Sequence, residues 1–153
     1  MALDLELTLP AAPEAVTQLL DRLEAHAEAM DMPPVLASRL CLVCEEMVSN
    51  VALHGAAAGA ARILLSVRAE GDGLRVVIED DGGAFDSLTA PPRVPDGPLE
   101  EREVGGLGLH FLRQLATGLH YERRDGMNRL SFGLLPGVRA GQPAAGKTDD
   151  LGN

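Results

Sequence analysis

The spacing of apolar and polar residues changes along this chain, and each spacing predicts one kind of element. Residues 3–9 alternate between leucines and mostly polar side chains, which predicts a half-buried strand that Pro10 ends. Residues 13–30 and 34–54, separated by a Pro-Pro pair, carry apolar side chains at helical spacing and predict two helices. The expected apolar faces are Val16, Leu19, Leu20 and Leu23 in the first helix and Leu36, Leu40, Val43, Met47 and Val51 in the second.

The later part of the chain predicts two hairpins. Residues 62–69 and 74–79 flank a Glu-Gly-Asp-Gly turn, and residues 119–124 and 128–134 flank an Asp-Gly turn. Strand, two helices, hairpin, helix and hairpin fit an α/β fold, namely a two-layer sandwich with helices on one face of a mixed, mainly antiparallel sheet. We expect one domain over residues 1–135, followed by a disordered Gly/Ala/Pro-rich tail at 136–153.

Composition fits a single soluble domain. The chain has 153 residues, enough to bury roughly 70% of its unfolded surface, and it contains no run of 18 apolar residues that predicts a membrane span. The acidic start lacks the basic region of a signal peptide, so we expect a cytoplasmic location. The net charge of −10 disfavours direct nucleic acid binding, because a polyanion is bound mainly through Lys and Arg.

Cys41 and Cys44 form a C-x-x-C inside the second predicted helix, near its apolar stripe. A zinc site needs a second pair of ligands, and a redox pair needs a thioredoxin-like context; the sequence offers neither. We therefore predict two small buried residues and no disulfide.

Three polar residues follow one line of the second predicted helix. Glu46, Asn50 and His54 are spaced i, i+4 and i+8 and therefore stack along one side. A carboxylate can accept a proton and an amide oxygen can ligate a hard cation, so the first two suit phosphoryl chemistry on a magnesium nucleotide. Alone, such a spacing also fits an ordinary solvated helix face.

Two glycine-bearing segments favour the interpretation as a nucleotide site over that of a solvated helix face. The strand at 74–79 runs into Asp80, Asp81 and Gly82, which puts a carboxylate at the rim of a sheet beside bare backbone, although an ordinary Asp-Gly turn has the same pattern. Residues 105–108 form a glycine cluster before a third helix, and glycines beside the free N–H groups of a helix start make an anion site. Between the two segments, residues 87–104 form a long proline-rich loop that fits a functional lid.

In this order the three segments resemble the nucleotide boxes of the GHKL (histidine-kinase-like) ATPases. The motifs are E-x-x-x-N in the second helix, D-x-G-x-x-F-D at 80–86 and G-G-x-G-L at 105–109. The chain is most similar to the bacterial anti-sigma-factor serine/threonine kinases, because Phe85 and Asp86 close the second motif, His54 follows Asn50 by four residues, and the closing segment 121–130 matches. The resemblance implies the Bergerat-type ATP-binding fold.

The resemblance also implies a role for each box. Asp80 would accept a hydrogen bond from the adenine amino group, Asn50 would ligate Mg²⁺ between the phosphates of ATP, and Glu46 would take the proton of the attacking hydroxyl. Gly82 would let the base approach the backbone, and Gly106 and Gly108 would donate N–H groups to phosphate. The implied ATP-binding set is completed by His54, Phe85, Gly105, Leu107 and Leu109.

By resemblance, the function would be that of an anti-sigma regulatory factor with serine/threonine kinase activity. It would phosphorylate a STAS-type anti-sigma-factor antagonist, bind a sigma factor by partner switching, and form a homodimer. Two alternatives stay open: an ATP-binding interaction module that transfers no phosphate, and a detached histidine-kinase-like catalytic domain. The Phe85-Asp86 ending argues against the latter. The lid region contains Arg93 and Arg102 but no lysine, so it offers no clear phosphate clamp.

Overall fold

The computed structural model describes residues 4–55, 57, 59–84 and 111–137. Four predictions lie outside these residues: Phe85 as an ATP-binding residue, the glycine segment 105–109, the lid at 87–104, and the tail beyond residue 137. Residues 111–115 are helical and form the described part of the third predicted helix. The other elements are β1 (Leu5–Pro10), α1 (Glu14–Ala29), α2 (Pro34–Asn50), the π-helical turn η1 (Val51–Gly55), β2 (Arg62–Glu70), β3 (Gly73–Asp80), β4 (Ala116–Arg124) and β5 (Met127–Leu134).

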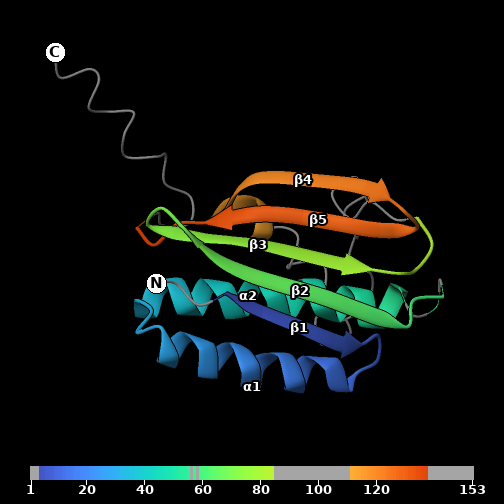
Figure 1. Cartoon of the computed structure of the whole chain (residues 1–153), viewed down its shortest axis with the longest axis horizontal. Helices are drawn as coiled ribbons and strands as arrows, with labels where there is room; N and C mark the ends of the chain where they lie inside the picture. Colours follow the sequence, from blue (N-terminus) through green and yellow to red (C-terminus); the bar gives the residue numbers. More distant parts are fainter. Residues whose placement is uncertain (1–3, 56, 58, 85–110, 138–153) are drawn as a thin grey trace, which may run out of the picture.

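The strands form one five-stranded sheet in the order β1-β2-β3-β5-β4, and α1 and α2 cover one of its faces (Figure 1). This confirms the two-layer α/β fold. All pairings among the described strands are antiparallel, so the parallel component expected of a mixed sheet does not occur among them. The reason is connectivity: tight turns join β2 to β3 and β4 to β5, and two successive helices return the chain so that β2 runs opposite to β1.

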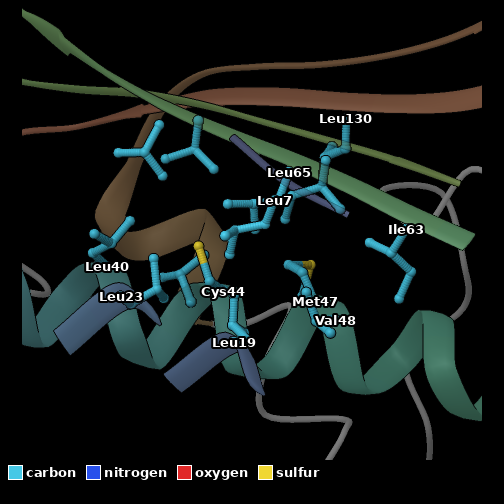
Figure 2. Close-up of a cluster of buried hydrophobic side chains, with 14 of the residues drawn as sticks. Leu7, Leu19, Leu23, Leu40, Cys44, Met47, Val48, Ile63, Leu65 and Leu130 are labelled. Carbon is cyan, nitrogen blue, oxygen red and sulfur yellow. The ribbon is translucent and has the colours of Figure 1, made fainter. Parts of the chain in front are cut away.

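The hydrophobic core lies between the helices and the covered face of the sheet. Figure 2 shows helix residues such as Leu19, Leu40 and Met47 pointing toward Leu7 and Leu65 of the strands. The buried stripe of α1 is Ala15, Leu19 and Leu23, whereas Val16 and Leu20, which the periodicity also placed inward, are half-buried. No helix within the described ranges is long and apolar enough to cross a membrane.

Both predicted hairpins are present, and positive backbone φ angles close them. Asp125 has φ +52° and Gly126 has φ +77°, the left-handed pair that a tight two-residue hairpin turn requires. Gly71, in the β2–β3 turn, has φ +58°. Strand β4 begins three residues earlier than predicted, directly after the 111–115 helix, and its pairing with β5 shifts register between Thr117 and His120.

The two cysteines are free thiols, as predicted, and both lie on α2. Cys44 is fully buried, and this burial raises the pKa of its thiol far above the ordinary value. Cys41 is half-buried, and burial followed by the nearby charges of Glu24 and Glu45 raises the pKa of its thiol as well.

We therefore expect little thiol reactivity in the folded protein. At pH 8, an excess of a chromogenic disulfide reagent should modify Cys41 slowly and Cys44 only after denaturant is added, because the attacking species is the thiolate and burial disfavours it. Peptide mass spectrometry identifies which thiol reacted. Rapid modification of both cysteines in the native protein would contradict the buried position of Cys44.

Candidate functional site

One row of side chains crosses all five strands at the end of the sheet where β3 ends. The register pairs Leu9 with Ile63, Ile63 with Asp80, Asp80 with Asn128, and Asn128 with Arg123. Cross-strand partners share a face of the sheet, and the burial of β3 and β5 alternates so that this face is the one toward the core. The apolar columns of β3 and β5 thus end in a polar pair.

Burial singles out this pair. Three polar or charged side chains are buried in the described part of the chain, and Asp80 and Asn128 are two of them, at 8% and 6% exposure. The third, Arg39, donates a hydrogen bond to the Leu135 carbonyl (2.8 Å) from the N-terminal half of α2. A buried carboxylate is costly unless hydrogen bonds stabilise it, so its contacts are informative.

Asp80 accepts two hydrogen bonds on the same oxygen. The backbone N–H of Gly82 donates to Oδ1 at 2.9 Å, and the Asn128 amide Nδ2 donates to it at 3.0 Å. A Cβ added to Gly82 would lie 3.1 Å from this Oδ1 and 3.0 Å from the Ala60 Cβ, so a side chain here would crowd the carboxylate, and glycine lets the turn pack closely against it. Its predicted role toward a base stays a prediction.

The neighbouring carboxylate has a different task. Asp81 Oδ1 accepts from the backbone N–H groups of Ala61 (2.8 Å) and Arg62 (3.0 Å), which fastens the end of β3 to the start of β2. These bonds, the one from Arg62 first, lower the pKa of Asp81. Of the two adjacent acids, Asp81 is therefore a structural residue, and Asp80 is the one that faces inward.

Three residues of the β4–β5 hairpin complete this cluster, and the sequence reasoning gave none of them a role. Asn128 Nδ2 also donates to the Gly83 carbonyl (2.8 Å), and its Oδ1 accepts from the Tyr121 hydroxyl (2.6 Å) and from Arg123 (3.2 Å). Arg123 donates a second bond to the Gly82 carbonyl at 2.7 Å. The alternation of apolar and polar residues in β5 could have identified Asn128, because it stands at an inward position of a strand that is otherwise apolar on that side.

The C-terminal end of α2 lies at the same end of the molecule as the end of β3 (Figure 1). Met47 and Val48 of α2 lie beneath Ile63, the cross-strand neighbour of Asp80 (Figure 2). Glu46 and Asn50, one turn apart on this part of the helix, are both half-buried. The two polar groups predicted from the sequence are thus carried to the end of the sheet that holds Asp80.

Glu46 is a half-buried carboxylate without a compensating contact. In the described part of the chain its side chain forms no hydrogen bond or ion pair. Burial, and secondly the charge of Glu45, raise the pKa of Glu46. Structural carboxylates are usually paired, whereas a perturbed and unpaired one is characteristic of functional sites, where a raised pKa improves a general base.

The helix changes its geometry directly after Asn50. Residues Val51–Gly55 form a π-helical turn, which is wider than an α-helical turn and is common at functional sites. The i+8 spacing that aligned His54 with Glu46 assumed continuous α-helix and does not hold across this turn. His54 is half-buried, and its contact with a nucleotide stays a prediction.

Comparison with known proteins identifies the fold and its family. The family model of the histidine kinase-like ATPase domain matches residues 9–134. The chain belongs to this family. The sequence-based assignment to the GHKL superfamily is thereby confirmed, and with it the expectation of an ATP-binding domain.

Two relatives are kinases of different classes. The serine/threonine-protein kinase BtrW of Bordetella bronchiseptica is 33% identical over 96 residues, which cover 61% of this chain and 66% of BtrW. Blue-light-activated histidine kinase 2 of Erythrobacter litoralis is 33% identical over 104 residues, which cover 66% of this chain and 27% of that protein. The chain thus spans just under two thirds of the first relative and about a quarter of the second.

A solved structure shares the fold. The crystal structure of the RsbU and RsbW domains of Rv1364c from Mycobacterium tuberculosis superposes with a TM-score of 0.62 at 16% identity. The superposition covers 90% of this chain and 34% of that chain. At this identity the likeness concerns the architecture alone.

The raised pKa of Glu46 predicts a stability change with a defined pH dependence. A carboxylate whose pKa is higher in the folded than in the unfolded protein destabilises the fold above both values, and this penalty disappears as the pH falls through them. Glu46→Gln should therefore raise the melting temperature at pH 7.5 by about 1–2 °C, and the gain should shrink toward pH 4. Differential scanning calorimetry across this pH range measures it. A variant less stable than wild type at pH 7.5 would refute the unpaired, desolvated state of Glu46.

Proposed function

We propose that this chain is an anti-sigma regulatory factor with serine/threonine protein kinase activity. It transfers the γ-phosphate of ATP to a STAS-type anti-sigma-factor antagonist and binds a sigma factor by partner switching. The observation that carries the kinase part is the half-buried, unpaired Glu46 one turn from Asn50, at the end of the sheet that holds the buried Asp80. Simple nucleotide binding needs no general base.

The described residues fit an adenine nucleotide. Asp80 is held by two N–H donors on one oxygen, so the carboxylate is oriented in a buried position where it can accept from the amino group of the base. Gly82, where a Cβ would lie within 3.1 Å of the Asp80 Oδ1, keeps the turn close to this carboxylate. The phosphate-binding role belongs to residues 105–109, by resemblance.

Asn50 fits a magnesium ligand, because its amide oxygen is a hard donor on a half-buried side chain that forms no hydrogen bond within the described ranges. When bound, Mg²⁺ supplies charge neutralisation of the phosphates. Glu46 accepts the proton of the substrate hydroxyl and orients that hydroxyl toward the γ-phosphate. No covalent intermediate on the kinase is required, because positioning and electrostatic stabilisation provide most of the rate.

The proposed partners come from the resemblance of the three motifs to the anti-sigma-factor kinases, and the similarity to a serine/threonine kinase supports them. The proposal includes a homodimer and a cytoplasmic location, where ATP and sigma factors are found. The net charge of −10 agrees with regulation through protein partners rather than through DNA. The family also contains histidine kinases, and the acceptor side chain, serine or threonine against histidine, is therefore the point that an experiment has to decide.

The decisive experiment compares two adjacent carboxylates. Glu46→Gln keeps the shape of the side chain but removes its ability to accept a proton, so phosphoryl transfer at saturating ATP should fall by about 10²–10⁴ while ATP affinity is retained. Glu45→Gln is the matched control, because Glu45 lies about 100° around the helix, and its loss should be far smaller. Intact mass spectrometry of a candidate STAS-type antagonist measures transfer, and peptide mapping identifies the acceptor residue.

Each alternative has its own outcome in this experiment. A wild-type protein that binds ATP and a sigma factor but phosphorylates no antagonist is an interaction module. Phosphate on a histidine would assign the histidine kinase class. Near-complete transfer by Glu46→Gln would mean that another residue is the base.

The metal role of Asn50 is tested separately. Asn50→Ala removes the amide oxygen, so ATP affinity measured by calorimetry should fall much more in the presence of Mg²⁺ than in EDTA. An equal loss in both conditions would assign Asn50 to the structure of the helix end instead.

A further inference from the structure

Four hydrogen bonds fix the orientation of the Asn128 side-chain amide. Its Nδ2 faces two acceptors, Asp80 Oδ1 and the Gly83 carbonyl, and its Oδ1 faces two donors, the Tyr121 hydroxyl and Arg123. A flipped amide would set oxygen against a carboxylate and NH₂ against a guanidinium, so the chemistry of the neighbours excludes it. All hydrogens and lone pairs of the amide are used.

This orientation determines how the Asp80 carboxylate is presented. Both of its hydrogen bonds, from the Gly82 N–H and from Asn128 Nδ2, fall on Oδ1. No bond from the described residues reaches Oδ2, and no buried side-chain oxygen in the described part lacks a partner, so Oδ2 is open to solvent or ligand. The carboxylate therefore offers one pure acceptor outward. Such an acceptor attracts an amino group and repels a keto oxygen.

We propose that Asn128 is a positioning residue that sets the base selectivity of the site, favouring a 6-amino purine nucleotide over a 6-oxo purine nucleotide. Arg123 supports it from β4, because the same guanidinium binds Asn128 Oδ1 and the Gly82 carbonyl and so ties the hairpin to the turn after β3. The inference rests on the proposed function in one respect, namely that Asp80 receives the base.

The test uses ATP and inosine triphosphate, which differ at the purine 6-position in carrying an amino group or an oxygen. Asn128→Ala frees the carboxylate to rotate, so ATP affinity should fall roughly 10–100-fold, whereas inosine triphosphate, already weakly bound, should lose much less. The ratio of the ATP affinity to the inosine triphosphate affinity, measured by calorimetry, should therefore fall toward one. A general loss of stability would weaken both nucleotides alike.

Asn128→Asp adds a readout in pH. The substitution keeps the shape of the side chain but replaces the amide group that donates to Asp80 with a second carboxylate. The two acids therefore share a proton at low pH. Apart from Asp80, the charged or titratable groups of the described residues that bond to Asn128 are Arg123 and Tyr121, both on β4. ATP affinity relative to wild type should be poor at pH 8 and should recover at least several-fold toward pH 5.5, as the shared proton restores a donor.

The matched control is Arg129→Gln, one residue along the strand, whose side chain pairs with Glu79 and Glu122 on the opposite face. It should keep the wild-type nucleotide ratio. A folded Asn128→Ala with an unchanged ratio, or Asn128→Asp with wild-type affinity at pH 8, would overturn the positioning role alone. If Asn128→Ala does not fold, the Asn128→Asp profile decides. A wild-type protein that binds neither nucleotide would overturn the proposed function as well.

Discussion

The buried hydrogen bond between Asp80 and Asn128 is the interaction on which the organisation of this protein depends. A carboxyl group at 8% exposure is costly without hydrogen-bond donors, and Asn128 and the Gly82 N–H provide them. The pair exists only because β3 and β5 are antiparallel neighbours in the register that sets these residues opposite each other. A shift by one residue would turn one of them to the outer face of the sheet.

The need to hold the Asp80 carboxylate in place also explains the number of hydrogen bonds made to the turn after β3. Arg123 binds the Gly82 carbonyl, Asn128 binds the Gly83 carbonyl, and Asp81 holds the start of β2. Four of the five strands thus contribute to the segment that follows β3. A rigid turn with an oriented carboxylate is the kind of preorganised site that binding a flat base requires.

Helix α2 combines two tasks that compete energetically. One side packs Leu40, Met47 and Val48 into the core, while Glu46 is left half-buried without a partner, with a raised pKa. Stability alone would favour a neutral residue at this position, so its presence is best explained by chemistry. Membership of this family does not distinguish a serine/threonine kinase from a histidine kinase, because the chain has relatives of both classes. The identity of the phosphorylated residue distinguishes them.

The sequence by itself determined the helices, the two hairpin turns, the free cysteines and the family, because periodicity, Asp-Gly turns and short motifs are local and are encoded along the chain. Asp80 was singled out from its place at a strand end, but its preference over Asp81 rested on the motif. Only the tertiary structure showed the separate tasks of these two acids, the role of Asn128 and Arg123, and the π-helical turn that separates His54 from the line of Glu46. The contacts that Asn128 makes with Asp80 and that Arg123 makes with Gly82 depend on cross-strand register and join residues more than 40 positions apart, which no local pattern contains.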